Sequence, residues 1–248
     1  MSIFGASMCT YDGYSNNTDN NSTIGENAQF YGSAESANVT NKSLSVEDTF
    51  WMQIINEFDM NLLVNNSWSG SKILDSNISA AGYNTRPTQL HDDNGENEGI
   101  TPDVIVSFMG NNDFTSNTTA GTINDELFTT IQGYVDNGTN YVPTTFAEGY
   151  IMMVYKMTKT YPNAKIFLFN MALRTATPSS LLITYNEIIE TVSEHYDCYV
   201  VDLTNSIMSG TDYAYYTIGD NLHPNAAGMD VWTDLVIEKF KECYINKK

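Results

Sequence analysis

The sequence predicts an α/β protein, built as a three-layer α/β/α sandwich around a five-stranded, mostly parallel central sheet. Five short apolar runs alternate with longer segments of helical periodicity. The strongest run, residues 104–109, is almost continuously apolar, as in a central parallel strand that is covered on both faces. Neither an internal repeat nor a linker divides the 248 residues, so we expect a single domain over residues 1–248.

The expected strands are residues 2–4, 61–65, 104–109, 164–169 and 198–202. The segments between them place apolar side chains at three-to-four spacing, which is typical of helices that pack on a sheet. Ser45, followed by two acidic residues, is a helix start signal. The expected helices are residues 45–58, a short one at 85–90, then 144–160, 179–196 and a last one from near Pro224.

Two long segments rich in Asn, Thr and Gly interrupt this pattern, near residues 10–45 and 114–143. Insertions of this length inside a compact domain are usually functional or mobile. The first insertion begins close to Ser7, so Tyr11 and Tyr14 are candidates for lining a pocket, with a surface turn as the competing interpretation. Tyr134 and Tyr141 are possible lining residues in the second insertion.

The charge balance restricts the possible partners. Eleven Lys and Arg residues against thirty Asp and Glu give a formal net charge of −19. Such a field repels phosphate backbones and anionic polymers, so we expect no nucleic-acid partner, whereas neutral molecules are indifferent to it. No apolar run reaches the roughly 18 to 20 residues that a membrane span needs. The start of the chain lacks the features of a signal peptide, which favours a cytoplasmic protein or one whose leader was removed.

The sequence gives no positive sign of a metal or a cofactor. The three cysteines, Cys9, Cys198 and Cys243, are widely spaced and form no CxxC pair, so neither a disulfide framework nor a zinc site is expected. Neither a GxxxxGK[ST] loop nor a GxGxxG turn follows a strand, and the GxSxG elbow of the common α/β-hydrolases is absent.

Asp220 and His223 form the most distinctive pair, directly before the last expected helix. A neutral histidine can accept a proton only if its other ring nitrogen is held in the right tautomer, and a nearby carboxylate supplies that restraint. A spacing of three residues puts both groups on one loop. The competing interpretation is a plain helix start, where an acidic residue is favoured by the helix dipole and the histidine is incidental.

Three further polar motifs follow expected strands: Gly5-Ala6-Ser7, residues 65–70 with Gly70 at the end, and Gly110-Asn111-Asn112-Asp113. Each alone could be an ordinary turn. Because parallel strands bring their carboxyl ends to one edge of the sheet, the three motifs together indicate a site at that edge. A serine can act there as a nucleophile, a glycine can offer its backbone N–H without obstruction, and an asparagine can donate from its side-chain amide.

With these four blocks in place, the chain resembles the SGNH (GDSL-like) serine hydrolase family over nearly its whole length. The resemblance implies a flavodoxin-like SGNH hydrolase fold, with Ser7 as nucleophile, His223 as base and Asp220 as its orienting acid. It also implies an oxyanion hole made by the N–H of Ser7, the N–H of Gly70 and the side-chain amide of Asn112. The block around the serine differs from the family pattern, because Ala6 stands where the family usually has aspartate; that aspartate is not a triad member.

The function expected from these residues is a serine esterase, of bacterial origin, that hydrolyses a short-chain acyl ester through an acyl-enzyme. An acetyl ester of a carbohydrate is the leading substrate class, because the polar loops near Ser7 are rich in Tyr and Asn and many family members act on acetylated sugars. Trp68, near the oxyanion donors, is a further candidate for lining the substrate site. Two alternatives stay open: a catalytically silent glycan-binding module on the same fold, and a lipase or thioesterase of the same family.

Overall fold

The computed structural model describes residues 1–15, 29–33, 44–92, 98–174 and 179–245. Its centre is a five-stranded sheet in the order β2-β1-β3-β4-β5. The expected mostly parallel sheet is confirmed, and every pair of neighbouring strands in it is parallel. The strands are β1 (Ser2–Gly5), β2 (Val64–Ser67), β3 (Val104–Phe108), β4 (Lys165–Phe169) and β5 (Tyr199–Val201).

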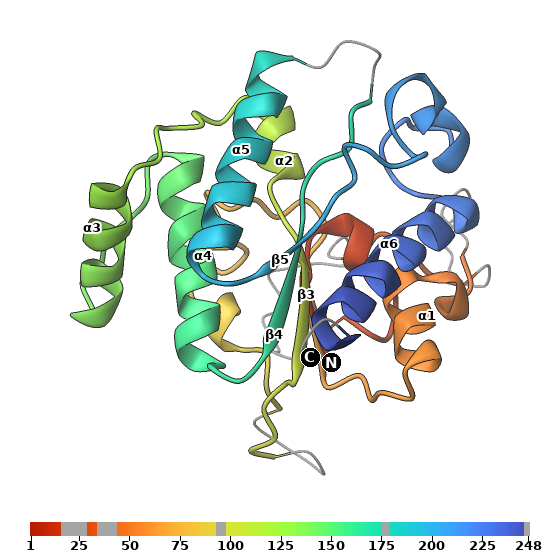
Figure 1. Ribbon diagram of the computed structural model, residues 1–248, viewed down its shortest axis with the longest axis horizontal. Coiled ribbons are helices and arrows are strands. Elements are labelled where there is room, and N and C mark those ends of the chain that lie inside the picture. The colour runs from red at the N-terminus through yellow and green to blue at the C-terminus, as the bar shows by residue number, and fades with distance from the viewer. Residues whose placement is uncertain (16–28, 34–43, 93–97, 175–178, 246–248) are drawn as a thin grey trace.

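Helices cover both faces of this sheet and complete the predicted three-layer sandwich (Figure 1). On one face lie α1 (Phe50–Glu57) and α6 (Ala226–Ile245), which pack against each other. On the other face lie α4 (Phe146–Thr160) and α5 (Ser180–His195), with the short α2 (Asn111–Thr115) near the upper end of α5. The outermost helix, α3 (Asp125–Asp136), packs on α4 and is separated from the sheet by it.

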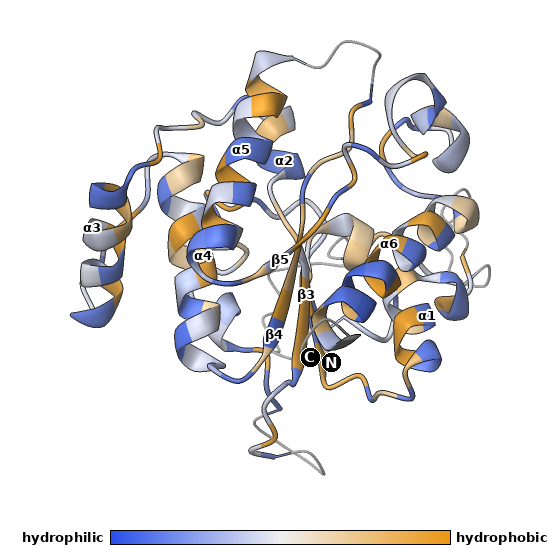
Figure 2. Cartoon of the chain, viewed as in Figure 1, coloured by the Kyte–Doolittle hydropathy of each residue, from blue (hydrophilic) through white to orange (hydrophobic). Residues whose placement is uncertain are grey.

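Large aromatic side chains fill the layer between the sheet and α6. Trp232 is fully buried, and its ring lies 5.0 Å from that of Phe108 and 5.2 Å from that of Phe169, measured between centroids. Edge-on and tilted contacts of this kind add to the free energy gained by burying the rings. The strands in the middle of Figure 2 are correspondingly hydrophobic, while the outer faces of the helices are hydrophilic.

The register of the central strands determines where the polar motifs lie. Gly5 at the end of β1 is opposite Ser67 of β2 and Phe108 of β3. The chain therefore leaves all three strands at the same level. Each of the three motifs recognised in the sequence continues directly from that level, at the carboxyl edge of the sheet.

Several element boundaries differ from the prediction. The second strand, expected at 61–65, lies at Val64–Ser67, and the last helix begins at Ala226, two residues after Pro224. The expected helix at 45–58 is divided into a single 3₁₀ turn, Val46–Asp48, and α1, because Thr49 caps α1 with its side chain. The short helix expected at 85–90 is one 3₁₀ turn, Arg86–Thr88.

The second insertion, 114–143, is not only loop, because it contains α3. Asn124 caps this helix, and its buried residues Phe128 and Ile131 face inward. The rings of Tyr134 and Tyr141 stack on each other at 4.3 Å. Tyr134 lies on α3, which packs on the outer side of α4 and not on the sheet (Figure 1).

Candidate active site

Ser7, His223 and Asp220 form a continuous row of hydrogen-bonded side chains. Ser7 Oγ lies 2.8 Å from Nε2 of His223, and His223 Nδ1 lies 2.6 Å from Oδ2 of Asp220. The carboxylate can only accept at Nδ1, so that nitrogen carries the hydrogen and Nε2 is left with its lone pair toward Ser7. The row therefore joins a hydroxyl, a base aimed at its proton and an acid that orients the base.

The carboxylate of Asp220 is held by the loop that it belongs to. Its second oxygen, Oδ1, accepts from the backbone N–H of Leu222 and of His223, both at 2.9 Å. Burial opposes ionisation, but these backbone hydrogen bonds and the one from the His223 ring outweigh it, so the pKa of Asp220 lies below its ordinary value. Asp220 is consequently ionised at neutral pH.

The loop that carries His223 is fixed against the segment before it and the helix after it. His223 O accepts from Ile218 N–H, and Asn225 uses its side-chain oxygen to accept from Gly228 N–H at the start of α6. A Cβ on Gly228 would lie 2.2 Å from the carbonyl oxygen of Tyr216, so only glycine allows this approach. The helix start proposed as the competing interpretation is thus real, and it positions the imidazole.

Ser7 begins the single 3₁₀ turn Ser7–Cys9 that follows β1. Cys9 N–H donates to Ala6 O, and the Thr10 hydroxyl donates to Ser7 O. The first N–H of a helical turn has no acceptor within that turn, which leaves the N–H of Ser7 free of an intrahelical partner. Ala6 is buried, so the turn forms with a small apolar residue at the position where the family has aspartate.

Gly70 and Asn112, the other two expected donors, follow β2 and β3 at the same edge of the sheet as the Ser7 turn. Gly70 has φ of +78°, a conformation that favours glycine, and its N–H has no hydrogen-bond acceptor within the described ranges. Asn112 uses one N–H of its amide to donate to Ser71 O at 2.8 Å. An amide nitrogen carries two hydrogens, so the second one remains for a ligand.

Comparison with known proteins gives the same family as the motifs. The model of the family described as GDSL-like Lipase/Acylhydrolase matches residues 1–240. The chain belongs to this family. It is therefore an enzyme of the ester-hydrolysing serine hydrolases.

Solved structures share the fold at low sequence identity. A putative GDSL-like lipase from Bacteroides ovatus is 22% identical, with 97% of each chain covered and a TM-score of 0.64. One from Bacteroides uniformis is 20% identical, covering 96% of this chain and 93% of its own, at a TM-score of 0.64. An active-site mutant of a family two carbohydrate esterase from Clostridium thermocellum is 15% identical, covering 97% of this chain and 62% of its own, at 0.55. No curated protein matches the sequence.

In this GDSL-like hydrolase, a buried carboxylate connects the third block to the segment after Gly70. Asp113 on α2 accepts from the backbone N–H of Ile73 at 2.8 Å and of Leu74 at 3.1 Å. Burial raises the pKa of Asp113 to about 6, although those two N–H groups act in the opposite direction. Asp113 therefore holds the backbone segment that follows Gly70.

An aromatic side chain that the sequence gave no reason to select lies on the imidazole. The ring of Phe30 stacks on that of His223, with centroids 3.5 Å apart and planes 12° apart. Its backbone N–H donates to the Thr10 hydroxyl, and the neighbouring Tyr31 donates from its own hydroxyl to Pro224 O. This short segment thus contacts both the Ser7 turn and the His223 loop. Phe30 lies in a polar insertion without periodicity, so no sequence pattern marks it.

The three candidate lining residues occupy different environments. Tyr11 is buried and donates from its hydroxyl to Leu44 O, which argues against a lining role. Tyr14 is 41% exposed and packs edge-on against Tyr11. Trp68 is half-buried, and its ring faces the guanidinium of Arg86 at 5.5 Å. Tyr14 is therefore the member of the set with most surface to offer.

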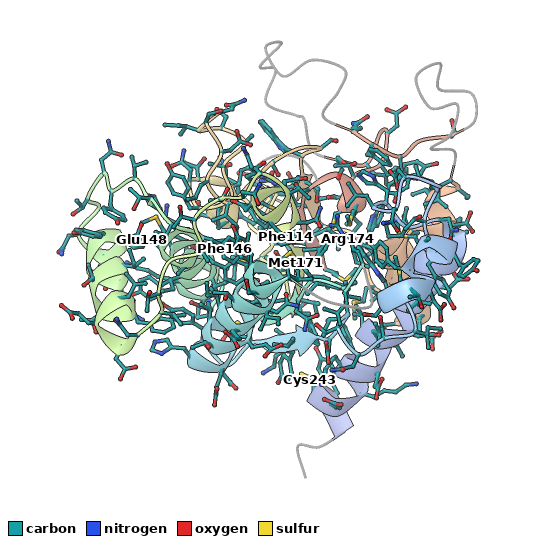
Figure 3. All side chains as sticks on the ribbon, turned by 90° about the horizontal axis from the view of Figure 1, so that it is seen from above. Phe114, Phe146, Glu148, Met171, Arg174 and Cys243 are labelled. Carbon is teal, nitrogen blue, oxygen red and sulfur yellow. The ribbon has the colours of Figure 1, made fainter. Side chains whose placement is uncertain are left out.

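Arg174 is a second cation that the motifs did not indicate. It follows β4, and Figure 3, which looks down on the carboxyl edge of the sheet, shows it among the side chains gathered there. Its guanidinium donates to the side-chain oxygen of Asn111 and lies 6.0 Å from the ring of Tyr213. Burial lowers the pKa of Arg174, while Tyr213 and Asp220 act in the opposite direction.

In the ranges that the structure describes, no group of three or more His, Cys, Asp or Glu side chains could hold a metal ion. Within those same residues, no helix is both long and apolar enough to cross a membrane. The chemistry available at the site is that of a hydroxyl, an oriented base and a set of N–H donors.

Proposed function

We propose that this GDSL-like hydrolase is a serine esterase that removes a short acyl group, with acetyl as the leading case, from a neutral carbohydrate ester. The observation that carries the proposal is the hydrogen-bonded row from Ser7 Oγ through His223 to Asp220. A serine hydroxyl is a weak nucleophile until an adjacent base removes its proton, and this row supplies the base and its orientation.

In the first step, Ser7 Oγ bonds to the ester carbonyl carbon while its proton passes to His223 Nε2. The carbonyl electron pair moves onto the oxygen, where the N–H of Ser7, the N–H of Gly70 and the free hydrogen of the Asn112 amide would receive it. When the oxyanion collapses, the bond to the alkoxy oxygen breaks and the alcohol leaves with the proton from His223. Water then repeats the sequence on the acyl-enzyme, releases the acid and restores Ser7.

Three observations favour a neutral sugar ester over a lipid. The net charge of −19 disfavours anionic substrates but not neutral ones. Tyr14 exposes aromatic surface in the polar insertion that begins next to Ser7, and aromatic rings suit the apolar faces of sugars. The carbohydrate esterase from Clostridium thermocellum has a similar fold, which adds acetylated polysaccharide fragments to the substrates worth testing.

The decisive test is hydrolysis of p-nitrophenyl acetate together with labelling by a fluorophosphonate probe. Wild-type protein should release nitrophenol and take up one label, whereas Ser7→Ala should lose both, with a fall in kcat of roughly 10⁴- to 10⁶-fold. Ser193→Ala is a matched control, because Ser193 is a buried serine on α5 that donates to Ile189 O. Absence of turnover and of labelling in the wild type would end the esterase proposal.

The substrate class needs a separate experiment. Acetate release from acetylated oligosaccharides should exceed release of long-chain acid from p-nitrophenyl palmitate when both are compared as kcat/KM. In the Tyr14→Ala variant, KM for the acetylated oligosaccharide should rise, whereas KM for p-nitrophenyl acetate should stay at the wild-type value. Preference for the long acyl chain would identify a lipase instead.

A further inference from the structure

Arg86 is a fully buried cation whose acceptors are all neutral groups. It belongs to the 3₁₀ turn Arg86–Thr88 and is 1% exposed. The guanidinium makes five hydrogen bonds, and none of the acceptors is a carboxylate. Nε donates to Asn66 Oδ1 (3.2 Å), Nη1 to Ser71 Oγ (3.2 Å) and Ala80 O (2.7 Å), and Nη2 to Gly5 O (2.9 Å) and Asn66 O (2.6 Å).

Four of these five acceptors, all except Ala80 O, belong to the segments that carry Ser7 and Gly70. Gly5 ends β1 and lies two residues before Ser7. Ser71 directly follows Gly70, and Ser71 O is the acceptor of the Asn112 amide. Arg86 therefore contacts the segments that carry Ser7 and Gly70 directly. It is linked to Asn112 through Ser71, which contacts both side chains.

A buried cation that donates no hydrogen bond to a carboxylate opposes folding unless its hydrogen bonds are complete, although the charge of Asp75 favours the protonated form of Arg86. Arg86 has five N–H donors and makes five hydrogen bonds, so its bonding capacity is filled. The rings of Phe4 and Trp68 lie 4.6 Å and 5.5 Å from its central carbon, which adds cation–π contacts. Burial lowers the pKa of Arg86 to about 9, and the group is still protonated at neutral pH.

Backbone donors stabilise an oxyanion only if they are already aimed at it before the reaction. The turn at Ser7 and the turn at Gly70 follow different strands. Few hydrogen bonds join them directly: Trp68 N–H donates to Gly5 O at 3.1 Å, and the Ser71 hydroxyl lies 3.5 Å from the same oxygen. Arg86 adds to these contacts, because its Nη2 donates both to Gly5 O and to Asn66 O. A planar fork with five donors can hold two backbone segments in one relative orientation, which the point charge of a lysine cannot do.

We propose that Arg86 is a positioning residue of the esterase reaction, which sets the Ser7 and Gly70 segments relative to each other so that their N–H groups meet the oxyanion together. This inference rests on the proposed esterase function. Because the donors act on the transition state and not on the bound ester, loss of Arg86 should lower kcat with little change in KM.

The test compares Arg86→Lys and Arg86→Gln with wild type, using p-nitrophenyl acetate. We expect kcat to fall about tenfold in the lysine variant and about a hundredfold in the glutamine variant, with KM within threefold of wild type. Lys156→Gln is the control, because Lys156 is a partly buried cation that donates to two carbonyls of the same loop, Tyr83 O and Asn84 O. It contacts neither oxyanion segment, so its kcat should stay near wild type.

Ser71→Ala covers the case in which the Arg86 variants do not fold. It removes the one side-chain hydroxyl among the acceptors of Arg86 and leaves the backbone oxygen that Asn112 uses. We expect kcat to fall three- to tenfold at constant KM. Three results would each overturn the role of Arg86. They are a kcat in Arg86→Lys that is no lower than in Lys156→Gln, a change in KM alone in the Arg86 variants, and an unchanged kcat in Ser71→Ala. The esterase proposal would still hold in each of these cases, provided that the wild type hydrolyses the ester.

Discussion

At the scale of single residues, the side chain of Asn112 has one observed contact and one proposed role. One N–H of its amide holds Ser71 O at 2.8 Å, and the other is available for the oxyanion. The first contact is a half-buried hydrogen bond of the ordinary kind, whose net contribution to stability is about 1 kcal/mol. The second contact belongs to the proposed function and would form only during the reaction.

Replacement of Asn112 by alanine should therefore affect the reaction far more than the fold. We expect kcat for p-nitrophenyl acetate to fall about a hundred- to a thousandfold, the typical effect of losing one oxyanion donor. The free energy of unfolding in urea should fall by only about 1 kcal/mol.

Asn84→Ala provides the comparison for this measurement. Asn84 also donates from its amide to a backbone oxygen, that of Ile78, but belongs to a loop outside the site. Its variant should lose a similar amount of stability and keep its kcat. If both variants retain full turnover, Asn112 has no part in the oxyanion hole.

Residues with a recognisable chemistry could be predicted from the sequence, and residues that act through burial could not. Asp220 and His223 share a loop, so their spacing alone shows that they can meet. Arg86 stands in a Thr-Arg-Pro turn, where an arginine is ordinarily solvated, and only the folded chain reveals its five acceptors. Phe30 acts through a ring contact across the site that no local pattern encodes.

At the scale of elements, the short segment after Gly70 is held to α2 by the Asn112 amide and by a buried carboxylate. Asp113 is buried and accepts from Ile73 N–H and Leu74 N–H, and burial raises its pKa to about 6. In the unfolded chain an aspartate titrates near about 3.9. Between these two values the native state binds more protons than the unfolded state does.

The contribution of Asp113 to stability should therefore decrease as pH rises from about 4 to about 6 and stay constant above that range. A pKa difference of two units corresponds to about 3 kcal/mol. The measurement is the free energy of unfolding at pH 4, 5, 6 and 7 for wild type and Asp113→Asn. Relative to the variant, wild type should lose stability across this window.

Two features make this measurement specific to Asp113. The difference between wild type and variant removes the titration of all other carboxylates, including Asp220, whose lowered pKa makes stability fall only as the pH drops below about 4. Asn84→Ala, which changes no titratable group, should give a difference that does not vary with pH across this window. A constant difference for Asp113→Asn as well would show that its carboxyl does not titrate in this range.

Elements were predicted best where the pattern was apolar and least well where polar residues are buried. The strand β2 was placed too early because Asn65 and Asn66 looked like its end. Both are buried within the strand, and their side chains donate to Cys9 O and Gln89 O. The apolar spacing of α3 is present in the sequence, but it lies inside a Thr- and Gly-rich insertion that favours a loop. The five residues of α2 are too few to show a period.

At the scale of the whole molecule, the net charge of the chain is opposite in sign to that of two side chains at the carboxyl edge of the sheet. The formal net charge is −19, yet Arg86 and Arg174 place two cations at that edge. Arg86 is enclosed, whereas Arg174 is only partly buried. An approaching ester therefore experiences the field of the whole protein at long range and that of Arg174 at short range.

Salt distinguishes these two effects, because it screens exposed charges beyond a Debye length that falls from roughly 30 Å at 0.01 M to about 10 Å at 0.1 M. If the net charge dominates, kcat/KM for mono-p-nitrophenyl succinate, an anionic ester, should rise about three- to tenfold over this range. The value for neutral p-nitrophenyl acetate should not change, and an ester with a quaternary ammonium acyl group should show the reverse trend. A fall in kcat/KM for the anionic ester would mean that Arg174 attracts it more strongly than the remaining charges repel it, and Arg174→Gln should then abolish that fall.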